Sequence, residues 1–195
     1  MIDWASKKAV NVLLKNGCIA KQDFEIYCFG MEVTILKLIH MVSMLIIGVC
    51  FGMVAETIAF IMAYFAIRVY AGGYHAKTRL GCYGCTLAII TFVLAVVKTC
   101  PLRTVWYECI VVLILSGIII AVIAPEGSSN KPLDKLEKSK YRKFTLIILC
   151  ALEFLAFVLV VRFKSSFGLV ITIVLGIESF MLILGRALTK FTLYT

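Results

Sequence analysis

Two side chains with basic and nucleophilic chemistry lie in one short segment. His75 and Cys82 are seven residues apart, in the run Gly-Gly-Tyr-His75-Ala-Lys-Thr-Arg-Leu-Gly-Cys82. An imidazole that takes the proton of a thiol leaves a nucleophilic thiolate. On one continuous helix the two residues would stand about 10.5 Å apart along the axis, too far for a hydrogen bond. The glycines Gly72, Gly73 and Gly81 predict a broken helix, and a turn there could fold the imidazole back onto the sulfur.

Cys82 falls where an apolar run begins, which predicts a position at the start of a helix. A helix N-terminus carries roughly +0.5 charge and unpaired backbone N–H groups, and both favour a thiolate. The neighbouring Lys77 and Arg79 act in the same direction. The same N–H groups could stabilise the oxyanion that forms when a carbonyl is attacked. The segment thus holds the minimum set for cysteine acyl transfer: a nucleophile, a base in His75 and an oxyanion site.

Three other interpretations of these residues stay open. Cys82 could be a packing residue at a helix start, with His75 in solvent. Cys82 and Cys85 form a Cys-x-x-Cys pair, which is compatible with a membrane thiol–disulfide oxidoreductase. A zinc site built from His75 and the two cysteines lacks an evident fourth ligand, so we expect neither a metal nor another cofactor.

A transport function is a further alternative. Ionisable side chains inside a membrane are costly and often mark a functional path. Arg68, His40 and Glu178 lie within or beside apolar runs and could line such a path. For His40 the simpler interpretation is a neutral ring that is hydrogen bonded to a neighbouring helix.

The composition identifies the class of protein that must position these groups. Of 195 residues, 62% are hydrophobic, and the formal net charge is +9. Soluble domains are about 45–50% apolar, so the chain is not an ordinary soluble enzyme, a disordered tail or a nucleic-acid-binding domain. Its 8 cysteines are scattered through apolar stretches, unlike the clustered cysteines of a secreted disulfide framework. The sequence predicts an all-α, polytopic membrane protein.

Six apolar runs predict six transmembrane helices. They span residues 33–53, 55–70, 82–97, 105–124, 144–161 and 167–185. Before them, polar residues recur every four positions at Asp3, Lys7, Asn11 and Lys15, which is typical of an amphipathic helix on a membrane surface. We therefore expect a single integral-membrane domain over 1–195, with an amphipathic interfacial segment at 1–30 and a six-helix bundle at 33–188.

The distribution of basic residues predicts the orientation in the membrane. With the N-terminus inside, the four outer basic residues are Lys98, Arg103, Arg162 and Lys164. The inner segments 1–32, 68–81, 125–143 and 186–195 hold fifteen. Because cytoplasmic segments are enriched in Lys and Arg, both termini and the His75–Cys82 segment are expected in the cytoplasm. The basic loop that follows Pro125 could bind anionic lipid or an acidic peptide.

The motifs resemble the AgrB family of membrane cysteine endopeptidases, which process quorum-sensing propeptides in Gram-positive bacteria. The similarity rests on the Gly-x-His-x6-Cys core with Arg68 upstream, on the Ala-Pro-x5-Lys-Pro loop at 124–132, and on the six-run pattern. It covers essentially the whole chain. The core motif shows no departure, although Cys85 is an additional thiol without an assigned role.

This resemblance implies a site and a reaction. The family's catalytic residues fall on His75 and Cys82, and its functionally important arginine and glycine fall on Arg68 and Gly73. We expect Gly72, Lys77 and Arg79 to support the site or bind substrate. The implied substrate is an autoinducing-peptide precursor with an amphipathic helix and an acidic C-terminal tail. The tail is cut off through an acyl-thioester on the cysteine, and the peptide cyclises to a thiolactone. The resemblance also implies a homodimer in the cell membrane that contacts lipid and no nucleic acid.

Overall fold

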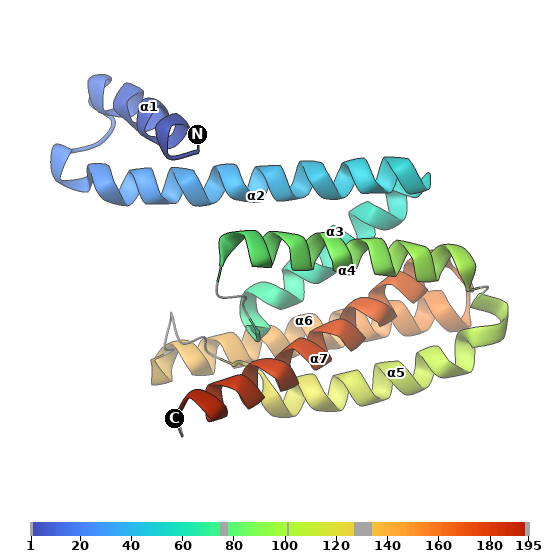
Figure 1. Cartoon of the computed structure of the whole chain (residues 1–195). Coiled ribbons are helices and arrows are strands. Elements are labelled where there is room, and N and C mark those ends of the chain that lie inside the picture. The colour runs from blue at the N-terminus through green and yellow to red at the C-terminus, as the bar shows by residue number, and fades with distance from the viewer. Residues whose placement is uncertain (1, 75–77, 101, 127–133, 194–195) are drawn as a thin grey trace. The chain divides into compact units, whose positions relative to one another are not determined.

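The computed structural model describes residues 2–74, 78–100, 102–126 and 134–193. In these ranges the regular structure is helical, with no β-strand. The α-helices are α1 (Ile2–Lys15), α2 (Phe24–Phe51), α3 (Val54–Ala71), α4 (Arg79–Thr99), α5 (Leu102–Ile123), α6 (Lys135–Val161) and α7 (Ser166–Leu193), and a 3-10 turn precedes α2 (Figure 1). The all-α prediction is confirmed.

Six of these helices, α2 to α7, are long and apolar enough to cross a membrane. This confirms the predicted number of spans, but two starts were placed too late. α2 begins at Phe24 rather than at residue 33, and α6 begins at Lys135 rather than at residue 144. An apolar run marks only the part of a helix that suits hydrocarbon. Residues 135–143 of α6 are rich in Lys, Glu and Arg, which are good helix formers, so that helix continues beyond its apolar run. Residues 24–32 of α2 are mostly apolar, and only Glu25 and Glu32 interrupt them.

The chain divides into two units, residues 1–46 and 47–195. In the first unit α1 exposes the four polar residues of the predicted polar face, Asp3, Lys7, Asn11 and Lys15, and buries Val10, although Trp4 is also exposed. The Lys7 amine lies 3.1 Å from the Asp3 carboxylate one turn earlier, and this hydrogen-bonded ion pair raises the pKa of Lys7. The helix ends at Lys15, well before residue 30. Its expected place on a membrane surface stays a prediction.

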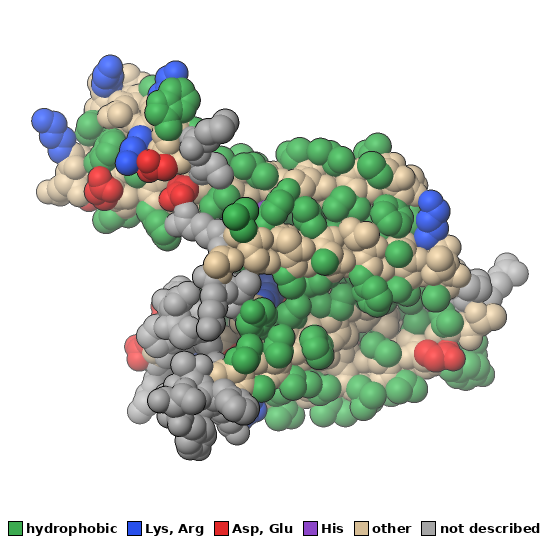
Figure 2. Space-filling view, in the orientation of Figure 1, with side chains coloured by type: hydrophobic (Ala, Val, Ile, Leu, Met, Phe, Trp, Pro, Cys, Tyr) green, Lys and Arg blue, Asp and Glu red, His purple; other side chains and the backbone are tan. Residues whose placement is uncertain are grey.

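In the second unit α7 is the core helix. It packs against α3, α4, α5 and α6. Of its most apolar stretch 61% is buried inside the protein, against 33% or less for each of the other spans. The other helices turn large apolar side chains outward, among them Met62, Phe92 and Phe154. In Figure 2 apolar side chains cover much of the visible face of these helices, as expected where lipid is the solvent.

Successive helices of this unit alternate in direction, so their connections gather at two ends. At one end a β-bridge joins Gly72, just after α3, to Glu126, just after α5. At the other end the Lys98 amine donates a hydrogen bond to the Phe51 carbonyl over 3.1 Å, and the Ser166 hydroxyl donates one to the Glu56 carboxylate over 2.9 Å. The α3–α4 and α5–α6 connections therefore share one end of the bundle, as the six-span prediction requires.

Candidate active site

The helix break predicted before His75 is present. α3 ends at Ala71, and Gly72 and Gly73 have φ values of +76° and +102°. Side chains with a Cβ rarely adopt this left-handed region, so the glycines let the chain leave the helix axis here. The expected break at Gly81 is wrong: this residue lies within the first turn of α4. A capping residue three positions earlier starts the helix and overrides the weak helix propensity of a glycine.

Cys82 lies in the first turn of α4, as predicted. Thr78 is the N-cap, and its hydroxyl accepts a hydrogen bond from the Gly81 N–H over 3.0 Å. The N–H of Cys82 itself donates to the Thr78 carbonyl over 3.0 Å. Any oxyanion donors must therefore come from the N–H groups at the very start of the helix, which have no intrahelical acceptor. The thiol is half-buried.

The Thr78 cap leads to a stability prediction. Thr78→Ala is expected to lower the free energy of unfolding by about 1 kcal/mol, because the Gly81 N–H loses its acceptor. Denaturant titration in mixed micelles measures this change. Thr91→Ala is the matched control: its exposed hydroxyl bonds only the Leu87 carbonyl within the same helix. That change should stay within about 0.5 kcal/mol. Equal losses of unfolding free energy in the two variants would show that the Thr78 N-cap contributes no more to stability than the Thr91 hydroxyl does.

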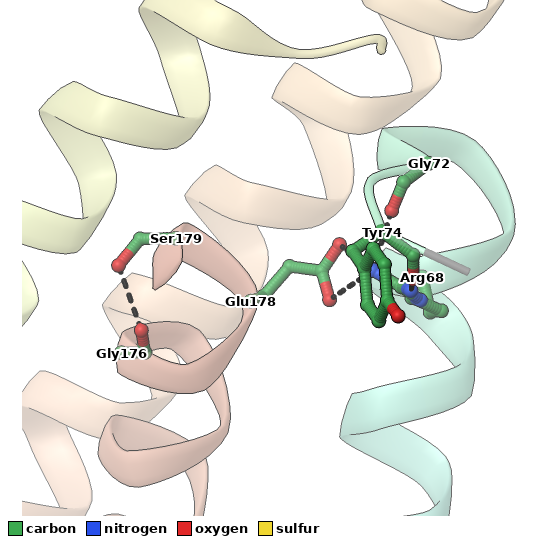
Figure 3. Close-up of polar contacts among 6 residues, drawn as sticks. All are labelled: Arg68, Gly72, Tyr74, Gly176, Glu178 and Ser179. Atoms are coloured by element: carbon green, nitrogen blue, oxygen red, sulfur yellow. Dashed lines mark hydrogen bonds and ion pairs between the residues drawn. The ribbon is translucent and has the colours of Figure 1, made fainter. Parts of the chain in front are cut away.

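Arg68 lies one turn before the end of α3 and turns its guanidinium toward the chain that follows. Nη1 donates to the Gly72 carbonyl over 2.7 Å and lies 3.3 Å from a carboxylate oxygen of Glu178 on α7, while Nη2 donates to the Tyr74 carbonyl (Figure 3). The Glu178 side chain is fully buried and that of Arg68 is 13% exposed. These donors face the protein's own backbone and Glu178, so the geometry fits an orienting role for Arg68.

The connection after α3 is also docked by its own backbone. The Tyr74 N–H donates to the Met181 carbonyl of α7 over 3.0 Å, and the Gly73 N–H donates to the Glu126 carbonyl over 3.4 Å. A Cβ at Gly185 of α7 would lie 2.8 Å from the Tyr74 nitrogen, so only glycine allows this close approach. The three residues that precede His75 are therefore held by α3, by α7 and by the chain after α5.

α4, which carries the two thiols, packs against the helices that carry the ion pair. It contacts α3, with Arg68, and α7, with Glu178. Cys82 and Cys85 lie in the first two turns of α4, so the thiols and the ion pair are on neighbouring helices.

Three of the predicted site residues are not placed. His75 and Lys77 lie outside the described residues, and so does the side chain of Arg79. The distance between the predicted base and nucleophile, and the zinc hypothesis that includes His75, therefore stay untested. Cys85 lies one helical turn after Cys82, and both thiols are free and half-buried.

The sequence reasoning missed the partner of Arg68. Glu178 was considered only as part of a transport path, although a carboxylate inside an apolar run was itself a signal that a buried cation should pair with it. Glu126 carried no comparable signal, because it contributes through its backbone.

Comparisons with known proteins give the family. The sequence model of the accessory gene regulator B (AgrB) family matches residues 6–182 of this chain. The protein FsrB of Enterococcus faecalis is 27% identical over 157 residues, which cover 78% of this chain and 64% of FsrB. The chain thus spans less than two thirds of that relative. AgrB-like proteins of Clostridium perfringens are 28% identical over 73% of the chain and 29% identical over 78% of it, and cover 69% and 75% of those relatives. No solved structure matches the chain. With nearly its whole length matched by the family, this chain belongs to the AgrB family.

Proposed function

We propose that the chain is a cysteine endopeptidase of the cell membrane that cleaves the C-terminal tail from an autoinducing-peptide precursor and promotes cyclisation to a thiolactone, in quorum sensing. The observation that carries this proposal is the placement of Cys82. Its half-buried thiol lies in the first turn of α4, which packs against α3 and α7, the two helices whose Arg68 and Glu178 fix the segment just before His75.

The first step is acyl transfer to Cys82. His75 takes the thiol proton, and the thiolate attacks the carbonyl of the scissile peptide bond. The N–H groups at the very start of α4, before Gly81, stabilise the oxyanion, with Lys77 and Arg79 adding positive charge. When the C–N bond breaks, the proton moves from His75 to the leaving amine, and the rest of the precursor stays on Cys82 as a thioester.

The second step closes the ring. A thiol within the bound peptide gives its proton to His75 and attacks the thioester carbonyl. The bond to Cys82 breaks, and the cysteine sulfur leaves with that proton. One thioester replaces another, so the step costs little free energy, and an internal thiol has a high effective concentration relative to water. A site at the membrane edge would further exclude water.

The basic residues support a cytoplasmic site and an acidic substrate. The α3–α4 and α5–α6 connections share one end of the bundle, and they are the segments expected to be rich in Lys and Arg. We propose that this end and both termini are cytoplasmic, since cytoplasmic segments retain basic residues. The same charge would attract the acidic tail of a precursor that binds the membrane surface through an amphipathic helix. A homodimer is proposed from the family resemblance alone.

A covalent adduct tests the function. The full chain in liposomes is mixed with an amphipathic, Cys-containing precursor peptide that ends in an acidic tail. We expect the Cys82 peptide to gain the mass of the precursor without its tail, and hydroxylamine to remove it, because a thioester is the intermediate. Mass spectrometry of the digested protein measures this gain.

The control is Cys85→Ser, which should form the same adduct. If Cys85→Ser prevents turnover as fully as loss of Cys82 does, and the pair is isolated oxidised, the thiol oxidoreductase is the correct function. A protein that turns over without any adduct on Cys82 would contradict the acyl-thioester mechanism.

A further inference from the structure

The ion pair between α3 and α7 has a geometry that a simple helix–helix contact does not need. Arg68 divides its donors between the Glu178 carboxylate, at 3.3 and 3.4 Å, and the carbonyls of Gly72 and Tyr74 (Figure 3). A guanidinium is planar and rigid, so the position of one acceptor constrains where its other N–H groups point. Glu178 therefore sets the direction in which Arg68 faces the connection after α3.

The carboxylate is the fixed part of this arrangement. Glu178 is fully buried on α7, the most buried helix of the second unit. A buried charge is stable only when it is paired and hydrogen bonded, so the Arg68 side chain is held at Glu178 rather than free to turn outward. α7 supplies a second anchor three residues later, where the Met181 carbonyl accepts the Tyr74 N–H. It supplies a third at Gly185, where the missing side chain leaves room for Tyr74.

We propose that Glu178 is a positioning residue for the Cys82–His75 chemistry. It acts through Arg68 to hold Gly72–Tyr74, the residues that lead directly into His75. This inference rests on the proposed function, in which His75 is the base for Cys82. Within it, the last spanning helix determines where the base-bearing segment leaves α3.

Amide exchange and thiol alkylation test the proposal on the full chain in detergent micelles, without any peptide substrate. In Glu178→Gln the Gly73 and Tyr74 amides should exchange at least tenfold faster with D2O, because Arg68 no longer holds their segment. Alkylation of Cys82 by iodoacetamide near neutral pH should slow by about 10- to 100-fold, as expected when a catalytic group is displaced by about 1 Å. The pH profile of that alkylation should also lose its component from the neighbouring base. Mass spectrometry of digested protein gives both rates.

Glu153→Gln is the matched control. It makes the same chemical change in a spanning helix, on α6, where the carboxylate lies against Gly117 of α5. It should leave both rates as in the unaltered protein. Should Glu178→Gln not fold, Gly185→Ala provides a second variant. Its added Cβ pushes on the Tyr74 nitrogen and leaves the ion pair intact, and the same two changes are expected.

The outcomes separate this proposal from the proposed function. Unchanged exchange at Gly73 and Tyr74 in Glu178→Gln would overturn the positioning role, and so would fast exchange with normal alkylation of Cys82. Equal effects from Glu153→Gln would reduce Glu178 to a general structural residue and overturn it as well. If Cys82 responds as expected but never forms an adduct with the precursor, the positioning role stands and the endopeptidase function fails.

Discussion

Cys82→Ser is expected to lower precursor cleavage by about 10³-fold or more, because it removes the nucleophile while leaving the rest of the site in place. A serine hydroxyl holds its proton far more tightly than a thiol, so His75 and the first turn of α4 would not convert it into an adequate nucleophile. Cleavage of the precursor peptide by the reconstituted protein, followed by mass spectrometry, measures the loss.

Two observations make this loss specific to chemistry. Cys82 is half-buried and serine differs from it by one atom, so the free energy of unfolding should change by less than about 1 kcal/mol. Cys85→Ser makes the same change one turn further along α4, at an equally half-buried thiol, and should keep most of the activity. Normal cleavage by Cys82→Ser would remove the acyl-thioester mechanism altogether.

Arg68→Gln is expected to lower the free energy of unfolding by about 3–5 kcal/mol, the usual cost of breaking a buried ion pair by removing one partner. The variant leaves the fully buried Glu178 carboxylate without its cation, and it removes the donors to the Gly72 and Tyr74 carbonyls. Denaturant titration of the purified protein in mixed micelles gives the change. Cleavage should fall as well, because the segment before His75 loses the Arg68 hydrogen bonds to the Gly72 and Tyr74 carbonyls.

The double variant Arg68→Gln, Glu178→Gln distinguishes charge from packing. Two neutral amides leave no unpaired charge, so the double variant should recover most of the lost stability. It should not recover cleavage, since the Arg68 guanidinium that donates to the Gly72 and Tyr74 carbonyls is still missing. If the double variant is as unstable as Arg68→Gln alone, the unpaired Glu178 carboxylate is not the cause of the lowered free energy of unfolding.

The helical architecture was predictable because each span is marked by an apolar run of neighbouring residues. A long apolar run in lipid must form a helix, because every backbone polar group needs a partner within the chain, and the six runs predicted the correct number of spans. The helix starts at Phe24 and Lys135 were not predictable from the same signal, because charged residues interrupt the apolar pattern there: Glu25 and Glu32 in α2, and mainly lysines in residues 135–143 of α6. Hydropathy indicates where a helix enters the lipid, and it does not indicate where the backbone hydrogen bonds of that helix begin.

Only those features of the candidate site that depend on neighbouring residues could be predicted from the sequence. Gly72, Gly73 and the start of the apolar run at Cys82 are features of neighbouring residues, and the structure places them at a helix end and a helix start as expected. The pairing of Arg68 with Glu178 joins positions 110 residues apart. One sequence gives no measure of which of several intramembrane charges will meet, because that depends on how α3 and α7 pack.

The position of α7 in the chain has a consequence for biosynthesis. This helix is translated after the other six, yet it forms the core of the second unit. It also supplies the Glu178 carboxylate that pairs with Arg68, the Met181 carbonyl that accepts the Tyr74 N–H, and the glycine at 185 against which Tyr74 packs. A nascent chain whose first five spans have left the translocon carries Cys82 but still lacks the contacts that α7 makes to that segment. The ribosome must therefore finish the last span before the segment that leads into His75 reaches the arrangement of the complete fold.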